Sequence, residues 1–435
     1  MSNIIAIVGR PNVGKSTFFN RMIQKREAIV DSESGVTRDR HYGKSDWNGR
    51  LFTLIDTGGY VENSEDVFQK EIDKQVSLAI DEADVILFMV DAAEGLTGMD
   101  ETIAKLLRKK GSQHVFLVVN KVDSARHLAG LHEFYGLGFE KLYPVSGING
   151  SGTGELLDDV VTVLPETVPV EEDELPRFAV IGRPNAGKSS LINALIGEER
   201  YIVTEVSGTT RDSIDTHYKR FGFEFKLIDT AGIRRKAKVK DDIEFYSVMR
   251  AVRAIEYADV CLLVFDASRG FDGQVQNIFW LAHRNHKGIV ILANKWDLVD
   301  KQAASFKEFE RQVMEKIAPF TDVPIVFTSV LNKQRIYKAI ETAVAVHKSR
   351  SIRISTPKLN DVMLPIIQKT PPPTHKGKYV RIKFCTQLPT PHPQFAFFCN
   401  LPQYVKDSYK RFIENNLRKQ FDLKGVPIQV FFRKK

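Results

Sequence analysis

Residues 9–17 read GRPNVGKST, and residues 182–190 read GRPNAGKSS. Both runs fit the Walker A pattern Gly-x-x-x-x-Gly-Lys-Ser, in which glycines let the backbone fold around phosphates and lysine supplies a positive charge. Three further paired motifs follow in the same order: GVTRD at 35–39 and GTTRD at 208–212, LIDTGG at 54–59 and LIDTAG at 227–232, NKVD at 120–123 and NKWD at 294–297. Matched order and near-constant spacing indicate a duplicated domain rather than a solenoid.

Apolar runs alternate with amphipathic segments in each repeat. In the first copy the runs are IIAIVG, LFTLIDT, DVILFMVDA and HVFLVVNK. Such short, continuously apolar runs are typical of strands buried on both faces of a parallel sheet. Residues 65–83 and 99–110 supply crossing helices. The sequence therefore predicts an α/β fold with two P-loop domains, each a doubly wound, mostly parallel sheet with ligands at the carboxyl ends of the strands.

Charge and composition divide the 435 residues further. The run PETVPVEEDELP at 165–176 predicts an exposed acidic linker between domains at 1–164 and 177–349. Residues 350–435 hold 17 Lys and Arg against 4 Asp and Glu. Its runs KYVRIKFCTQ and PIQVFFRKK predict strands, and VKDSYKRFIENNLRKQF predicts a helix, so this segment is expected to form a small, basic α+β domain.

Several classes of protein are excluded or disfavoured. The three cysteines, Cys261, Cys385 and Cys399, are too few and too far apart for a disulfide framework or a zinc site. No run of 18 apolar residues and no signal peptide is visible, which predicts a cytoplasmic protein without a membrane span. The basic C-terminal segment favours a polyanionic partner, nucleic acid, over a merely solubilising surface.

The Walker loops predict two phosphate sites. Lys15 is expected to contact the β- and γ-phosphates and the Ser16 hydroxyl to bind Mg²⁺, with Lys188 and Ser189 doing the same in the second copy. The nucleotide-binding residues assigned to these loops are Gly9, Arg10, Pro11, Asn12, Val13, Gly14, Lys15, Ser16 and Thr17, and Gly182, Arg183, Pro184, Asn185, Ala186, Gly187, Lys188, Ser189 and Ser190.

Two motifs between the Walker loop and NKxD predict the hydrolytic groups. A carboxylate ending a strand, Asp56 or Asp229, can hold Mg²⁺ through water, while the Gly59 or Gly232 amide meets the γ-phosphate; an Asp-initiated turn is the alternative. Thr37 and Thr210 can bind Mg²⁺ when a γ-phosphate orders their loops, or can merely cap a turn. The candidate catalytic residues are Lys15, Thr37, Asp56, Gly59, Lys188, Thr210, Asp229 and Gly232, and their neighbours Thr57, Gly58, Tyr60, Thr230, Ala231 and Ile233 are assigned to nucleotide binding.

The NKxD motifs predict the base. A carboxylate at Asp123 or Asp297 can accept hydrogen bonds from guanine N1–H and its exocyclic amine, whereas adenine offers neither donor and would leave the carboxylate unpaired. The predicted ligand is therefore GTP. The guanine-binding residues are Asn120, Lys121 and Asp123, and Asn294, Lys295 and Asp297.

With these motifs the chain resembles the Der (EngA) family, bacterial tandem-G-domain GTPases of ribosome biogenesis. The resemblance covers essentially the whole chain, and the runs PPPTHKGKYVRIKF, SYKRFIENNLRKQF and KGVPIQV resemble that family's KH-like domain. It implies a monomeric GTPase that supports maturation of the large (50S) ribosomal subunit and acts on its rRNA. The alternative is a nucleotide-gated RNA- or ribosome-binding module, or a translation-associated switch, in which hydrolysis is secondary.

The resemblance also implies how hydrolysis proceeds. Asn12 and Asn185 match the asparagine that helps hold K⁺ beside the phosphates in related GTPases. Tyr60 and Ile233 stand where Ras-like switches have a water-orienting glutamine, so intrinsic turnover is expected to be slow. K⁺ or the ribosome is expected to stimulate it, since a charged element supplied in trans can raise such rates about 10³–10⁵-fold.

The chain departs from family patterns in two places. Many G domains have Ser-Ala in the last guanine-contacting loop, whereas this chain has Ser146-Gly147 and Ser329-Val330. A serine and a backbone amide are still offered, so Ser146 and Ser329 are assigned to the site. The G-x-x-G loop by which KH domains clamp RNA is absent, because the basic segment has only Gly377 and Gly425.

Overall fold

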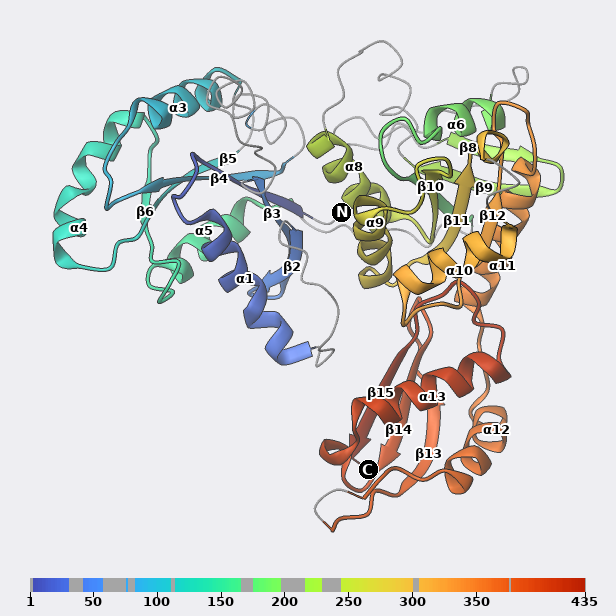
Figure 1. The fold of residues 1–435 in the computed structure, drawn as a ribbon. Helices are drawn as coiled ribbons and strands as arrows, with labels where there is room; N and C mark the ends of the chain where they lie inside the picture. Colours follow the sequence, from blue (N-terminus) through green and yellow to red (C-terminus); the bar gives the residue numbers. More distant parts are fainter. Residues whose placement is uncertain are drawn as a thin grey trace. The chain divides into compact units, whose positions relative to one another are not determined.

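The computed structural model describes residues 3–30, 42–57, 76, 83–110, 114–165, 175–196, 216–228, 244–299, 305–374 and 377–434. Contacts within the chain group it into two units, Met1–Val170 and Glu171–Lys435. Figure 1 shows the fold, with labels on most of the helices and strands.

The first unit contains a six-stranded sheet in the order β2-β3-β1-β4-β5-β6. Its strands are β1 (Asn3–Val8), β2 (Tyr42–Trp47), β3 (Arg50–Asp56), β4 (Val85–Asp91), β5 (His114–Asn120) and β6 (Leu142–Pro144). The helices are α1 (Lys15–Val30), α3 (Gly98–Lys110), α4 (Ala125–Ala129), the 3-10 helix η2 (Gly130–Leu137) and α5 (Thr153–Val163). Every neighbouring pair is parallel except β2 with β3. All residues of β1 and β4 are buried, as strands covered on both faces must be.

The second unit repeats this order as β8-β9-β7-β10-β11-β12. Its strands are β7 (Arg177–Ile181), β8 (Thr216–Arg220), β9 (Phe223–Ile228), β10 (Val260–Asp266), β11 (Gly288–Asn294) and β12 (Ile325–Phe327). The helices are α6 (Lys188–Ile196), α8 (Glu244–Tyr257), α9 (Gly273–Arg284), the 3-10 helix η3 (Trp296–Leu298), α10 (Phe306–Ile317) and α11 (Ile336–Ser351). The antiparallel pair is again at the edge, β8 with β9. The two mostly parallel sheets expected from the sequence are confirmed.

A small C-terminal domain belongs to the second unit. Its sheet has the order β13 (Ile382–Gln387), β14 (Gln394–Cys399), β15 (Gln429–Lys434), with β13 antiparallel and β15 parallel to β14. Helices α12 (Thr356–Lys369) and α13 (Asp407–Gln420) and the 3-10 helix η4 (Pro402–Tyr404) complete it. The predicted α+β class is confirmed.

The sequence did not predict helix α12. Its run contains Pro357 and Pro365, which signal a break. Pro357 lies in the first turn, where its missing N–H costs nothing, and Pro365 lies inside the helix. The buried residues Leu359 and Met363 pack this helix on the C-terminal core. Tertiary packing thus outweighs the lost hydrogen bond.

Backbone hydrogen bonds join the C-terminal domain to the preceding domain. The amide of Ile289, at the amino end of β11, donates to the Gly425 carbonyl at 2.8 Å, and the Gly425 amide donates to the Asp322 carbonyl at 2.7 Å. The partly buried Arg418 guanidinium on α13 donates to the Val426 carbonyl at 2.8 Å and lies 4.7 Å from the centre of the Phe320 ring. This join lies at the end of the sheet opposite the predicted nucleotide motifs.

None of the helices in the described ranges combines the length and apolar character required to cross a membrane. The expected helix at 65–83 lies almost entirely outside the described residues, whereas that at 99–110 corresponds to α3.

Candidate functional site

The predicted site residues of the first unit gather at the carboxyl ends of its parallel strands. The Walker loop follows β1, Asp56 ends β3, and Asn120 ends β5. Strand pairing sets Ile7 opposite Asp56 and Asp91 opposite Asn120, which brings their loops to one edge. The sheet of the second unit repeats the arrangement, with Asp266 opposite Asn294.

Glycine is required where the Walker loop approaches its neighbours. Gly14 has φ +94° and Gly187 has φ +98°, and a β-carbon at either position would collide with the side-chain amide of Asn120 or Asn294. Only a residue without a side chain combines this backbone conformation with so close an approach. The loops therefore lie directly against the asparagines of the NKxD motifs.

Each of these asparagines connects three loops. In the first unit Asn120 Nδ2 donates to the Val13 carbonyl at 2.8 Å, and its Oδ1 accepts from the Gly147 amide at 2.8 Å. In the second unit Asn294 Nδ2 donates to the Ala186 carbonyl at 2.9 Å, and its Oδ1 accepts from the Val330 amide at 3.1 Å. The asparagine pair, Asn120 and Asn294, thus fixes the Walker loop relative to the predicted base-reading loops in both copies.

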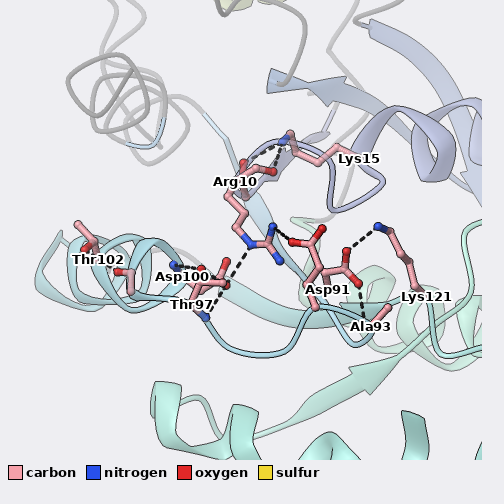
Figure 2. Close-up of polar contacts among 11 residues, drawn as sticks. Arg10, Lys15, Asp91, Ala93, Thr97, Asp100, Thr102 and Lys121 are labelled. Atoms are coloured by element: carbon pink, nitrogen blue, oxygen red, sulfur yellow. Dashed lines mark hydrogen bonds and ion pairs between the residues drawn. The ribbon is translucent and has the colours of Figure 1, made fainter. Parts of the chain in front are cut away.

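The Walker lysines point into their own loops. Lys15 Nζ donates to the carbonyls of Gly9 and Arg10 at 2.8 and 2.7 Å (Figure 2). Lys188 Nζ donates to the carbonyls of Gly182 and Arg183 at 2.7 and 2.5 Å. Burial lowers the pKa of Lys15 to about 8, against the opposing effect of Asp56. A phosphate group in the loop would restore a favourable environment for the charge.

The donor set beside Lys15 fits a hard divalent cation. Ser16 Oγ donates to the Asp56 carboxylate at 2.5 Å, so one hydroxyl and one fully buried carboxylate lie together. Oxygen ligands of this type suit Mg²⁺, which keeps several of its waters in nucleotide sites. Thr57, next along the chain, donates from its hydroxyl to the Ile7 carbonyl at 2.8 Å, so its side chain satisfies a backbone acceptor of β1.

The predicted base-reading residues follow β5 and β11. Lys121 and Lys295 both have left-handed backbone, with φ +64° and +58°. The predicted guanine acceptor Asp123 receives a 3.5 Å contact from Asn149 Nδ2. Ser146 Oγ accepts from the Asn149 amide at 3.2 Å, which makes it a turn-forming group of this loop.

Asp297 and Ser329 occupy the corresponding positions in the second unit. Asp297 lies in η3, and Ser329 Oγ accepts from the Asn332 amide at 3.4 Å. The second base-reading loop is therefore built like the first.

Sequence reasoning missed two carboxylates that orient these lysines. Lys121 Nζ lies 2.5 Å from Asp91 Oδ2 (Figure 2). In the second unit Lys295 Nζ lies 2.6 Å from Asp266 Oδ2. Burial opposes ionisation of Asp266, but hydrogen bonds from Lys295 and Ser268 outweigh it and hold the pKa of Asp266 below its usual range. The signal was present as an aspartate ending the same strand in both copies, VDAAEG and FDASRG.

Three further missed carboxylates anchor the arginines of the Walker loops. Arg10 bonds Asp100 at 3.2 Å and Glu94 at 2.6 Å, and Arg183 forms an ion pair with Asp272, the N-cap of α9. Because each arginine is paired with carboxylates of a neighbouring loop or helix, it holds the Walker loop in place rather than supplying a free charge. The predicted positions Asn12 and Asn185 have left-handed backbone in the same loops, with φ +65° and +60°.

The remaining predicted Walker residues that the structure describes also lie in the strand-to-helix turns or the first helical turn: Pro11, Thr17, Pro184, Ser189 and Ser190. Ten predicted residues lie outside the described ranges: Thr37, Gly58, Gly59, Tyr60, Thr210, Asp229, Thr230, Ala231, Gly232 and Ile233.

Two family models match the chain. The model described as "50S ribosome-binding GTPase" matches residues 4–121 and again 177–295. The model described as "KH-domain-like of EngA bacterial GTPase enzymes, C-terminal" matches residues 353–433. Together they cover the first five strands of each six-stranded sheet and most of the basic C-terminal domain.

Curated relatives match from end to end. Proteins named GTPase Der from Christiangramia forsetii, Flavobacterium psychrophilum and Porphyromonas gingivalis are 70%, 63% and 55% identical to the chain. In each case the match covers 100% of this chain and 100% of the relative. Because these matches span the full length of both sequences at 55% identity or more, the chain belongs to the GTPase Der family, the family also called EngA.

Proposed function

We propose that this chain binds and hydrolyses GTP at two sites and serves as a cytoplasmic, monomeric factor for assembly and maturation of the large ribosomal subunit. The observation that carries the proposal is the asparagine pair. Asn120 and Asn294 make equivalent hydrogen bonds to the Walker loop and to the last base-contacting loop. Because both copies keep this three-loop connection, both are expected to hold a guanine nucleotide.

The roles of individual residues follow from their positions. Lys15 and Lys188 neutralise the β- and γ-phosphates, and Asp123 and Asp297 accept the hydrogen bonds of guanine. Ser16 and Asp56 hold Mg²⁺ in the first site, as Ser189 and Asp229 do in the second. Thr37 and Thr210 complete the Mg²⁺ shell when GTP is present, and the Gly59 and Gly232 amides meet the γ-phosphate.

Neither copy has a water-orienting glutamine after its aspartate motif, since Tyr60 and Ile233 occupy that position. Turnover by the chain alone is therefore slow. We assign the missing stabilisation to K⁺, held with the help of Asn12 and Asn185, and to the ribosome. Both would act on charge that develops between the β- and γ-phosphates.

The basic C-terminal domain supports rRNA of the large subunit as the partner. Lysine and arginine exceed acidic residues there by 17 to 4. Such a surplus binds a polyanion by releasing its counterions, which makes the affinity depend on salt.

The missing glutamine also favours a second candidate, a nucleotide-gated ribosome-binding module or translation-associated switch in which hydrolysis is secondary. Variants Thr37→Ala and Thr210→Ala that retain GTP affinity separate the two. Prolonged retention on ribosomal subunits supports hydrolysis-driven release, whereas unchanged release supports the binding module.

Calorimetry on the full chain is expected to give two GDP molecules per chain and no detectable binding of ADP. Co-sedimentation with large ribosomal subunits should increase with a non-hydrolysable GTP analogue relative to GDP, and should weaken as salt rises. A stoichiometry of one, or equal affinity for adenine and guanine nucleotides, would contradict the two-site proposal.

Nucleotide affinity of the first site is expected to fall as pH rises above about 8. The pKa of Lys15 is about 8 in the free protein, and bound phosphates raise it because they favour the charged form. Below pH 8 the lysine is already charged, so affinity is at its maximum; above it, binding must take up a proton, and affinity falls by up to about tenfold per pH unit.

The measurement is GDP titration between pH 7 and pH 9 in a chain whose second site is disabled by Asn294→Ala. Lys15→Arg in the same background is the control, because arginine stays charged and any remaining dependence then belongs to the nucleotide. Parallel pH profiles for lysine and arginine would refute the assignment.

A further inference from the structure

The C-terminal sheet has one face packed on helices and an opposite face that we call the open face. Leu359 of α12 and Ile413 of α13 share one core cluster with Phe395 and Phe397 of β14. Because side chains alternate along a strand, Phe398 points to the other side. Both long helices of this domain therefore cover the same face, on which Phe398 does not lie.

Aromatic rings and a guanidinium occupy the open face. Strand pairing sets Phe398 beside Phe384 on one side and beside Arg433 on the other. The Phe384 and Phe398 rings stack with centroids 4.4 Å apart and planes 9° apart. The Arg433 guanidinium lies 6.0 Å from the centre of the Phe431 ring, and both Phe398 and Phe431 are partly exposed.

The four acidic residues of this domain all lie outside its three strands. Asp361 lies on α12, Asp407 and Glu414 lie on α13, and Asp422 follows α13 directly. None of the four belongs to β13, β14 or β15. The open face consequently combines flat rings with a cation and lacks a strand carboxylate.

One end of the open face is held against the preceding domain. His392, beside β14, stacks on His286 with ring centroids 4.5 Å apart and planes 11° apart. Gln394 Nε2 donates to Gln429 Oε1 at 2.7 Å across the two strands. Rings on such a frame are pre-organised, which reduces the ordering cost of binding.

We propose that the open face binds single-stranded RNA, with bases stacked on Phe398 and Phe431 and the backbone held by Arg433. Unpaired bases have exposed π-faces that stack on aromatic side chains, whereas paired bases hide theirs inside the duplex. The absence of a G-x-x-G loop removes the alternative clamp for RNA. This inference rests on the proposed function, in which the C-terminal domain meets rRNA.

The test uses the full chain and a 12-nucleotide single-stranded RNA with a central 2-aminopurine, whose fluorescence falls when the base stacks. The double variant Phe398→Leu with Phe431→Leu keeps the face apolar but removes both rings. It is expected to bind about 30-fold more weakly and to lose the quenching. Phe221→Leu, at an exposed ring in the turn before β9, is the matched control and should leave both unchanged.

A charge variant keeps the test decisive if the double variant does not fold. Arg433→Gln leaves the rings in place and should weaken binding several-fold and flatten its salt dependence. Lys358→Gln, an exposed lysine on α12, is its control and should do neither. Wild-type affinity and quenching in a folded double variant, or wild-type affinity and salt dependence in Arg433→Gln, would overturn the proposal.

A photo-crosslinker at position 431 separates RNA from a protein partner. Cross-links to the oligonucleotide support the proposal. Cross-links to residues 1–170 of the chain or to a ribosomal protein that persist in saturating RNA overturn it. If the wild-type chain binds the oligonucleotide as expected but does not co-sediment with large subunits, the proposed function fails while the open face stands.

Discussion

Replacing Asn294 by alanine is expected to lower the affinity of the second site for GDP about 100-fold and to leave the first site unchanged. The variant loses the bonds to the Ala186 carbonyl and from the Val330 amide, both of which are buried. Each buried group left without a partner costs about 1–3 kcal/mol, and 2.7 kcal/mol corresponds to about 100-fold. Asn120→Ala should do the same to the first site alone.

The measurement is calorimetric titration of the full chain with GDP, which resolves two classes of site once one is weakened. Asn416→Ala is the matched control, because Asn416 Nδ2 also donates to a backbone carbonyl, that of Phe412 at 2.8 Å, but on α13. Two sites of unaltered affinity in Asn294→Ala would show that the three-loop connection does not support nucleotide binding.

Gly425→Ala is expected to destabilise the second unit by about 2–4 kcal/mol and to lower its thermal midpoint by roughly 5–10 °C. Gly425 has φ +72°, and an added β-carbon would lie 2.9 Å from the Ile289 carbonyl oxygen and 2.8 Å from Val346 Cγ2. The positive φ strains any L-residue, and the two close contacts force apart the join between the C-terminal and preceding domains.

Gly377→Ala separates the two causes. Gly377 also has φ +72°, but an added β-carbon would meet no atom within 4 Å. This control should cost only the strain of about 1 kcal/mol. Scanning calorimetry of both variants gives the difference, and equal shifts would mean that packing at the join contributes nothing.

The sequence predicted the parts of the fold that local pattern determines. The strands before and after each motif are continuous apolar runs, so their burial and parallel pairing follow from composition. Because the motifs recur in the same order, the same arrangement of strands is predicted for both copies. Asp123 was assigned to guanine because a carboxylate at that position matches one base, and this assignment also stays a prediction. The roles of loop residues such as Thr37 and Gly59 stay predictions.

Contacts between distant segments could not be predicted in the same way. In the sequence Asp91 is only the last residue of an apolar strand. Its role becomes visible in the folded structure, where Lys121 Nζ lies within 2.5 Å of its carboxylate. Helix α12 was missed because Pro365 argues locally against a helix that tertiary packing nevertheless maintains. From the sequence alone Gly425 is indistinguishable from an ordinary turn glycine. Its role in joining the two domains depends on Ile289, which lies 136 positions earlier in the chain.

The backbone hydrogen bonds of Gly425 determine how the second nucleotide site can affect the C-terminal domain. The C-terminal sheet is fastened to the amino end of β11, and the nucleotide motifs lie at the carboxyl end of the same strand. Because β11 spans only Gly288–Asn294, a displacement of this strand would carry its contact with Gly425 along. We therefore expect nucleotide binding at the second site to change the orientation of the basic domain toward its ligand. The affinity of the basic domain for that ligand is set instead by the salt concentration.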